Sequence, residues 1–416
     1  MSNRIRDCRI CSSENFDVII NLGSQCLTGV FPSNETEDPE SEPLELLKCA
    51  NCGLVQLAHN FNPKSMYGEN YGYRSGLNQS MVTHLNKKAV ELDGLLNIGP
   101  NDTVIDIGSN DGTFLSNFVK KGAKLIGVDP TANKFRNFYD PSIQIIADFF
   151  PTHEIRESEV KAKLISSIAM FYDLPDPVDF ARAIKNNLHA EGVWHFEQSY
   201  LPEMLNTISY DTICHEHLEY YTLGVIEKIL LEVGMKVIDA KLNTTNGGSI
   251  AVTAAHVDSK KIETSDLIEV RNLEAGMNLQ NIDSYQDFAA STTAHRENLV
   301  RVLRSLKSEG KKVYGLGAST KGNVLLQYCQ ITSDLVEKIG EVNKEKFGKI
   351  TPGSHIPIIS EIEMRGDSPD VLLVLPWHFK DSIIERESDF LASGGALLFP
   401  LPKLTFVTSE GESSDY

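Results

Sequence analysis

Short apolar runs alternate with stretches of helical spacing through the middle of the chain. Each run has the length of a buried strand rather than of a helix. A helix is expected first, over 77–96, and the runs then cover residues 103–107, 124–128, 163–168, 192–197, 235–239 and 250–255. Strands that alternate with helices predict a mostly parallel sheet with right-handed crossovers. We therefore expect an α/β domain in this part of the chain.

A second pattern of the same kind lies near the C-terminus, after a helical stretch at 265–310 that separates the two. A helix is expected near 322–328, and strands are expected over 312–317, 370–375 and 395–400. The two patterns share no short repeat, so we predict two separate α/β domains joined by helices.

The composition excludes several functions. With 41% hydrophobic and 23% charged residues among 416, the chain has the balance of a folded protein of two or three domains. Its formal net charge of −18 opposes the backbone of a nucleic acid, so no nucleic-acid partner is expected. The first residues lack the apolar core of a signal peptide, and no apolar run has the length of a membrane span. We interpret the protein as cytoplasmic, without a membrane partner.

Four of the seven cysteines stand in two Cys-x-x-Cys pairs, Cys8 with Cys11 and Cys49 with Cys52. Each pair can place two thiolates on one ion, and two pairs complete the tetrahedral site that zinc prefers. Such a site leaves no open coordination position, so the predicted zinc is structural. It would stabilise a small N-terminal subdomain that has little core. Two unrelated pairs of buried or redox-active thiols are the alternative.

A glycine-rich turn, Gly-Ser-Asn-Asp-Gly over 108–112, follows the first predicted strand and opens a helix expected at 113–121. Glycines let the backbone turn sharply and approach a ligand, and a helix N-terminus offers free amides. The next strand ends at Asp129, where a carboxylate can accept the hydroxyls of a ribose. A tight turn that binds no ligand is the alternative.

The residue types in this turn favour S-adenosylmethionine over a dinucleotide. A dinucleotide site uses Gly-x-Gly-x-x-Gly, and the carboxylate of Asp111 would repel a pyrophosphate. Asp106 and Asp111 instead suit the sulfonium and ammonium groups of S-adenosylmethionine. Asp148 and Phe149, after the third strand, are placed to bond the adenine amino group and to stack beside its ring. The candidate cofactor-binding residues are Asp106, Gly108, Ser109, Asn110, Asp111, Gly112, Asp129, Asp148 and Phe149.

The densest run of functional groups contains Cys214, His215, Glu216 and His217. Its spacing differs from the His-Glu-x-x-His helix of zinc peptidases. On a loop, these groups suit the removal of a proton from carbon, with His217 or His215 as the base and Glu216 beside it. A polar turn that caps the following helix is the alternative.

Two further segments carry groups that suit a substrate. Tyr71 and Tyr73 lie in an irregular segment, where they either line a site or pack a domain interface. In the C-terminal pattern, Gly315, Gly317 and Lys321 form a strand–turn–helix of the kind that binds phosphate, and we expect an anion near Lys321. A structural turn with an exposed lysine is the alternative there.

Together these motifs resemble the sugar C-methyltransferases that act on a 4-keto nucleotide-linked deoxysugar. The resemblance covers nearly the full length, and it rests on the cysteine pairs, Cys52–Leu57, Ile107–Gly112, His215–His217, Gly247–Ser249, Lys321–Asn323 and Pro352–Ser354. It implies an α/β fold with a small N-terminal zinc-binding subdomain, a central class I methyltransferase Rossmann-like domain and a C-terminal Rossmann-like α/β domain.

The expected boundaries follow from the patterns and from this resemblance. They are a zinc-binding domain at 1–75, an S-adenosylmethionine-binding methyltransferase domain at 76–260, a helical connector at 261–310, a C-terminal Rossmann-like domain at 311–408 and an acidic tail at 409–416, expected to be disordered.

The resemblance also implies residue roles. His217 is the leading base with Glu216 beside it, and the remaining catalytic candidates are His215, Tyr71 and Tyr73. The candidate substrate-binding residues are Lys321, Asn323, Cys214 and Tyr221. The implied reaction removes the proton next to the ketone and gives an enolate, which attacks the sulfonium methyl in line. Zinc would be bound by Cys8, Cys11, Cys49 and Cys52.

Two segments depart from the family pattern. Cys214 stands where the family often has tyrosine, and residues 170–175 replace the usual histidine-containing segment after the fourth strand. Both lie on the expected substrate side, so the sugar and the methylated atom stay open.

The leading hypothesis is thus methylation of a carbon in a nucleotide-linked 4-keto-deoxysugar, by a monomer or small homo-oligomer. An O- or N-methyltransferase on a nucleotide sugar is the nearest alternative, since it needs no enolate. An NAD-dependent dehydrogenase or epimerase, and a sugar-nucleotide binding module without catalysis, are the other two.

Overall fold

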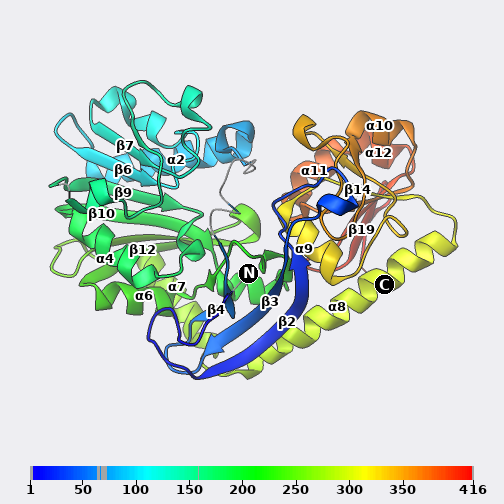
Figure 1. The fold of residues 1–416 in the computed structure, drawn as a ribbon, viewed down its shortest axis with the longest axis horizontal. Coiled ribbons are helices and arrows are strands. Elements are labelled where there is room, and N and C mark those ends of the chain that lie inside the picture. The colour runs from blue at the N-terminus through cyan, green and yellow to red at the C-terminus, as the bar shows by residue number, and fades with distance from the viewer. Residues whose placement is uncertain (1–2, 63–65, 67–72, 158, 415–416) are drawn as a thin grey trace.

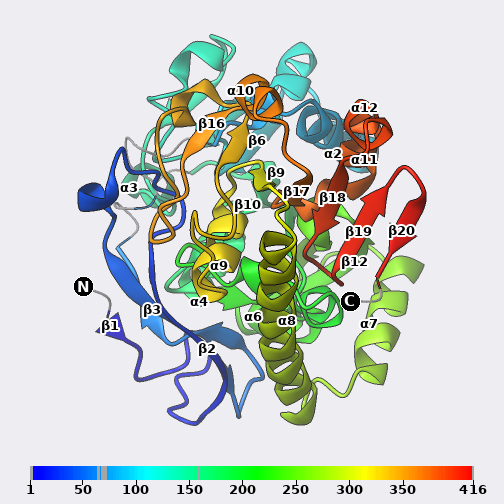
Figure 2. The ribbon, with the colours of Figure 1, turned by 90° about the vertical axis from the view of Figure 1, so that its right-hand side faces the viewer.

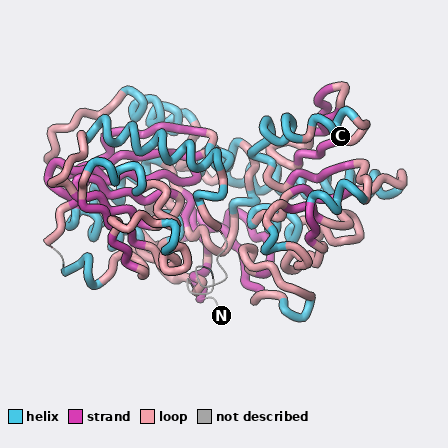
Figure 3. The backbone as a smooth tube through the Cα atoms, turned by 90° about the horizontal axis from the view of Figure 1, so that it is seen from above, coloured by secondary structure: helices cyan, strands magenta, loops and turns pink. Residues whose placement is uncertain are grey.

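The computed structural model describes residues 3–62, 66, 73–157 and 159–414. Two α/β bodies lie side by side, and the N-terminal strands and the long helix α8 run beneath them (Figure 1). The view from above shows strands in the middle of each body with helices around them (Figure 3). The predicted α/β class, with two Rossmann-like units, is confirmed.

The N-terminal unit is a four-stranded antiparallel sheet in the order β11-β4-β3-β2. Its first strands are β2 (Phe16–Cys26), β3 (Ser41–Cys49) and β4 (Val55–Leu57). The fourth strand, β11 (Glu219–Tyr220), belongs to a segment far along the chain, directly after the His-Glu motif. The smaller elements of this unit are β1 (Asn3–Arg4), β5 (His59–Asn60) and the 3-10 helix η1 (Glu35–Glu37).

The central unit is a seven-stranded sheet in the order β12-β13-β10-β9-β6-β7-β8. Neighbouring strands are parallel, except that β13 is antiparallel to both β10 and β12. The strands are β6 (Thr103–Ile107), β7 (Lys124–Val128), β8 (Gln144–Ile146), β9 (Ala162–Ile168), β10 (Leu188–Ser199), β12 (Met235–Asn243) and β13 (Ser249–His256). The strand order reverses between β6 and β9, and ligands bind at the carboxyl ends of strands at such a point.

Helices cover both faces of this sheet. The α-helices are α2 (Gln79–Leu96), α3 (His153–Glu157), α4 (Pro177–Asn187), α5 (Leu201–Asn206) and α6 (Leu223–Glu232). The 3-10 helices are η2 (Ser75–Leu77), η3 (Leu115–Lys121), η4 (Arg136–Phe138), η5 (Phe171–Asp173), η6 (Tyr210–Thr212) and η7 (Thr245–Gly247). The stretch expected as a helix over 113–121 is therefore the shorter 3-10 helix η3.

Two helices, α7 (Ser265–Gly276) and α8 (Asp283–Ser308), fill the predicted helical stretch between the bodies. Figure 2 shows α8 end to end beneath the C-terminal body. Its buried residues recur every three or four positions, from Tyr285 and Phe288 to Leu299 and Val302, so one face is covered along its length. Within the part of the chain that the structure describes, no helix is long and apolar enough to cross a membrane.

The C-terminal unit repeats the reversal of strand order, with a sheet in the order β16-β15-β14-β17-β18-β19-β20. Its first five strands in this order are parallel, and β19 and β20 are antiparallel additions. The strands are β14 (Val313–Leu316), β15 (Ile339–Glu341), β16 (Ile358–Ser360), β17 (Val371–Val374), β18 (Ala396–Phe399), β19 (Thr405–Thr408) and β20 (Gly411–Ser413). The helices are α9 (Thr320–Tyr328), α10 (Glu361–Gly366), α11 (Lys380–Arg386), α12 (Ser388–Ala392), η8 (Lys344–Lys346) and η9 (Trp377–Phe379).

The acidic tail differs from the expected disorder. Residues Gly411–Ser413 form β20, which pairs with β19, and Glu412 forms an ion pair with Lys380 at 2.7 Å. The prediction of a disordered tail is therefore wrong for these residues. An edge of the sheet supplies backbone partners to the tail, and its charged composition gave no sign of them.

Candidate functional site

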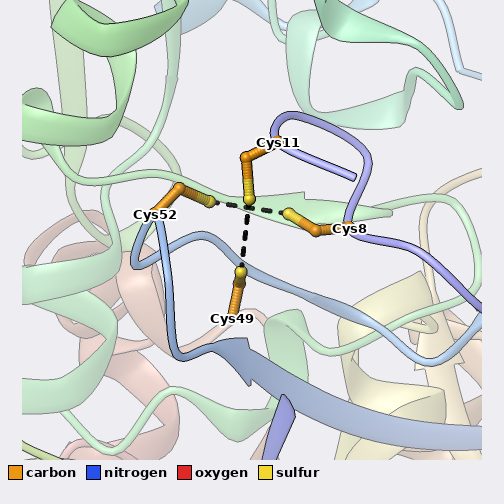
Figure 4. Close-up of side chains that lie close together, drawn as sticks. All are labelled: Cys8, Cys11, Cys49 and Cys52. Carbon is orange, nitrogen blue, oxygen red and sulfur yellow. Dashed lines mark hydrogen bonds between the residues drawn. The ribbon is translucent and has the colours of Figure 1, made fainter. Parts of the chain in front are cut away.

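The four predicted zinc ligands converge on one point (Figure 4). The Sγ atoms of Cys8, Cys11, Cys49 and Cys52 all lie within 4.8 Å of one another. The shortest separations, Cys8–Cys52 and Cys11–Cys49, are 3.5 and 3.6 Å, and all four cysteines are free of disulfides. Four sulfurs at about 2.3 Å from a tetrahedral zinc are about 3.8 Å apart. The cluster therefore fits a closed zinc site.

The cysteine cluster is fastened to the His-Glu segment by Arg9, which lies between Cys8 and Cys11. Its Nη1 donates to the Leu57 carbonyl at 2.8 Å, and its Nε lies 3.5 Å from the carboxylate of Glu219. Both charged side chains of this ion pair are almost fully buried. Since β4 also pairs with β11, the segment that carries the predicted base is held by the zinc unit.

One cavity of about 550 Å³ connects the glycine turn, the His-Glu segment and the first turn of α9. Its size is typical of a ligand site. Its wall is formed by the carboxyl ends of β6, β7, β9 and β10, by the loops that follow them, and by the first two residues of α9. The predicted site residues that line it are Tyr73, Asp106, Gly108, Ser109, Asn110, Asp111, Asp129, Asp148, Phe149, Cys214, Glu216, His217 and Lys321.

The glycine turn has the geometry that its sequence predicts. Gly108 and Gly112 have φ values of +73° and +76°, which residues with a side chain rarely adopt. A Cβ on Gly108 would lie 3.1 Å from Met170, and a Cβ on Gly112 would lie 2.7 Å from the ring of Tyr139. Gly112 thus packs against that ring behind the wall and does not line the cavity.

Two buried carboxylates at this end of the cavity suit a cationic cofactor. Asp106 accepts a hydrogen bond from Ser166 at 2.7 Å, and burial raises its pKa to about 7. Asp129 accepts bonds from the backbone amides of Thr131 and Asn110 at 2.6 and 2.8 Å. No described lysine, arginine or histidine forms an ion pair with either carboxylate. Their environment therefore fits the charged and hydroxyl groups of S-adenosylmethionine.

Asn110 and Asp111 also hold the segment that precedes α2. The Asn110 amide donates to the carbonyl of Tyr73 at 3.1 Å, and Asp111 accepts from the backbone amide of Gly76 at 2.9 Å. These bonds place Tyr73 beside the cavity. Tyr71, the other tyrosine predicted here, lies outside the described residues.

His217 is poised as a neutral imidazole. Its Nδ1 lies 3.0 Å from the carbonyl of Thr212, which can only accept, so Nδ1 carries the proton and Nε2 has a free lone pair. The ring packs against Tyr172, with 4.3 Å between centroids. Burial and the positive charge of Lys321 lower the pKa of His217 to about 4.

Glu216, the acidic residue next to His217, has a pKa that is shifted in the opposite direction. Burial raises the pKa of Glu216, and a hydrogen bond with Cys214 opposes that shift. The Oε2 atom of Glu216 is buried and bonds to no described residue. The cavity therefore holds a neutral imidazole and, next to it, a carboxyl group that favours its protonated form.

Lys321 is not the exposed lysine of a structural turn that one alternative predicted. This lysine lines the cavity, its Nζ donates to the Asn246 carbonyl at 2.7 Å, and burial lowers its pKa. No described carboxylate lies within ion-pair distance of it. A cation held in this way suits an anionic group of a ligand.

Besides Gly112, three more predicted residues do not reach the cavity. His215 is fully buried, with Nε2 donating to the Glu42 carbonyl and its ring against Phe61, because the turn from Cys214 to His217 points the two histidines apart. Tyr221 stacks on Phe171 at 5.2 Å between centroids. The Asn323 amide donates to the Thr28 carbonyl at 2.7 Å and so joins the C-terminal unit to the N-terminal one.

Glu197, a buried acid that lines the cavity near the end of β10, is not among the residues predicted from the sequence. It bonds to His84 at 2.6 Å and Lys88 at 3.0 Å, one helical turn apart on α2, and to Asn243 at 3.1 Å. Burial opposes its charge, but the bond from His84 and the charge of Lys88 hold its pKa at about 2. Its position as the last residue of a predicted strand was the available indication.

Comparison with known proteins gives matches along the chain. Three family models match in order: "Putative zinc binding domain" at 8–67, "Methyltransferase domain" at 79–240 and "C-methyltransferase C-terminal domain" at 244–402. The C-methyltransferase NovU of Streptomyces niveus is 30% identical over 412 residues, 98% of each chain.

Solved structures match a smaller share of the chain. A S-adenosylmethionine-dependent methyltransferase of Clostridium acetobutylicum is 17% identical, with a TM-score of 0.33, over 44% of this chain and 92% of its own. The 1,6-didemethyltoxoflavin N1-methyltransferase of Burkholderia thailandensis is 13% identical, with a TM-score of 0.32, over 42% and 78%.

The cysteine cluster predicts one zinc per chain. Cys49→Ser removes a thiolate from the site, so we expect loss of the metal and of several kcal/mol of stability. Metal analysis and thermal melting measure both. Cys26→Ser is the matched control, because Cys26 is buried outside the cluster. Equal zinc content in the two variants would contradict the assignment.

The surroundings of His217 predict a low pKa. NMR titration of the histidines should show His217 neutral down to about pH 4, with its resonance assigned by its loss in His217→Gln. Lys321→Met removes a nearby positive charge that disfavours the imidazolium, so the pKa should rise in that variant. A midpoint near 6.5 in the wild type, unchanged in Lys321→Met, is the contrary result.

Proposed function

Because the chain belongs to the C-methyltransferase family, we propose that it methylates a carbon next to the ketone of a nucleotide-linked 4-keto-deoxysugar. S-adenosylmethionine is the methyl donor, as in other methyltransferases of this fold, and zinc is structural. One observation carries the proposal: a single cavity is lined by the glycine turn, by His217 and by Lys321. The glycine turn would bind the methyl donor, His217 would remove the proton from carbon, and Lys321 would bind the anion.

The cofactor end is assigned to the carboxylates of the glycine turn. Asp106 and Asp129 would bind the cationic and hydroxyl groups of the donor, and Phe149, which is partly exposed at the cavity, would stack beside its adenine. The bound donor supplies an electrophilic sulfonium methyl group. The protein's part at this end is to orient that methyl group toward the carboxyl ends of β9 and β10.

His217 is assigned as the base. Its Nε2 lone pair takes the proton from the carbon next to the ketone, and the electron pair of that C–H bond passes to the ketone oxygen as an enolate. The bound donor would supply the methyl group to that carbon, and the ketone would form again as the enolate electron pair makes the new C–C bond. The Thr212 carbonyl stabilises the imidazolium through Nδ1–H.

Glu216 is assigned to the enolate oxygen. Burial raises the pKa of this carboxyl, and in its protonated form Glu216 would donate a hydrogen bond to the developing negative charge. Its Oε2 atom is buried and bonds to no described residue, and Glu216 lines the cavity. In this proposal His217 is the base and Glu216 is the acid.

Lys321 is assigned to the nucleotide diphosphate. It lies at the start of α9, where backbone amides also favour an anion, and it faces the same cavity as the base. The nucleotide would then lie against the C-terminal unit, with its sugar at His217.

The proposal is tested by incubating the enzyme with S-adenosylmethionine and a panel of dTDP-, GDP-, CDP- and UDP-4-keto-6-deoxysugars in deuterated buffer. Mass spectrometry and NMR should find a new carbon-bound methyl in one product. Deuterium should enter beside the ketone when S-adenosylhomocysteine replaces the donor. An oxygen- or nitrogen-bound methyl, or no methylation of any sugar, would contradict it.

Substitution of each histidine should show which of the two acts as the base. His217→Asn removes the proton acceptor, so kcat should fall by about 10²- to 10⁴-fold with little change in the affinity for S-adenosylmethionine. His215→Gln is the matched control: it keeps a donor for the Glu42 carbonyl, and it should lower the melting temperature but keep most of kcat. Comparable loss of kcat in both variants would argue against His217 as the base.

A further inference from the structure

Gln198, the residue before the last of β10, is a buried polar residue at the cavity that the proposed chemistry does not use. Its side chain is 1% exposed, and neither Nε2 nor Oε1 forms a hydrogen bond in the described structure. Buried polar groups in native proteins are almost always bonded, and each exception needs an explanation. A primary amide with both its donor and its acceptor unused is a strong exception.

The place of Gln198 in the fold suggests the explanation. It borders the 550 Å³ cavity, where β10 lies beside the end of β9, and the loop residue Met170 lines the same wall. The glycine turn, where the cofactor is expected, follows β6 on the other side of β9. Gln198 lines the same cavity as Tyr172 and His217.

The neighbouring side chain on the same strand shows the contrast. Glu197 also lines the cavity, but His84, Lys88 and Asn243 occupy its carboxylate, so it serves to hold α2 against the sheet. No such partners surround the amide of Gln198. A ligand oxygen is the partner that the wall lacks.

We propose that Gln198 is a substrate-contacting residue whose side-chain amide hydrogen bonds an oxygen of the sugar. The inference rests on the proposed function, because it takes a nucleotide-linked sugar as the ligand. A hydroxyl group matches the amide best, since it can accept from Nε2 and donate to Oε1. A contact of this kind also selects the substrate, because an analogue without that hydroxyl leaves the amide buried and unbonded.

The test compares Gln198→Met with Gln25→Met. Gln25 is a matched control, because it is 2% exposed and both of its amide atoms lack partners in the described structure, yet it is not part of the cavity wall. Each change deletes an unbonded buried amide and keeps its length, so neither should lower the melting temperature. We expect kcat/KM for the sugar nucleotide to fall about 10- to 100-fold in Gln198→Met only. The affinity for S-adenosylmethionine should stay unchanged in both.

Three outcomes overturn the proposal. If Gln198→Met keeps the kcat/KM of the wild type, the amide contacts no substrate. If Gln198→Met and Gln198→Ala both melt well below the wild type, the amide has a structural role instead. If the wild type neither methylates nor binds any sugar nucleotide, the proposed function fails and this inference fails with it. Only the first two leave an active wild type, so the two failures are distinguishable.

Discussion

The pairing of β4 with β11 is the constraint on which the site depends. It takes a strand of two residues, Glu219 and Tyr220, from the far end of the central unit and adds it to the N-terminal sheet. Arg9, within the first cysteine pair, reinforces it through the Leu57 carbonyl and the carboxylate of Glu219. His217, the proposed base, lies two residues before β11 and is therefore positioned by the zinc-binding unit as well as by its own domain.

This arrangement divides the work among three units. The central sheet presents the carboxylates of Asp106 and Asp129 at its switch point, and the N-terminal sheet holds His217 over the same crevice. The C-terminal unit closes the cavity with Lys321, which is tied to the central unit through the carbonyl of Asn246. Because each group comes from a different unit, the cavity exists only when all three are packed together.

The sequence predicted those parts of the fold that depend on local chemistry. The glycine turn at 108–112 and the two cysteine pairs each reflect a short-range rule, and both have the expected geometry in the structure. The strands lie where they were predicted, but β10 is twice as long as the predicted strand at 192–197. The long-range consequences could not be predicted. The motif containing His215 and His217 does not show which histidine faces the cavity, since a turn between them decides it.

Other features depend on partners that are distant in the sequence. The strand formed by the acidic tail needs a neighbouring sheet edge, and the bond of Asn323 needs the carbonyl of Thr28. That the amide of Gln198 lacks a hydrogen-bond partner is known only from the positions of all its neighbours in the folded structure. No composition or periodicity contains this information.

Hydrogen exchange with and without zinc tests most directly that the zinc-binding unit positions His217, the proposed base. After removal of the metal, the amides of 214–221 and of β4 should lose protection together, while those of β6 and of the glycine turn stay protected. Protection at 214–221 that persists without zinc, or that is lost equally in β6, would show that the zinc unit does not position His217.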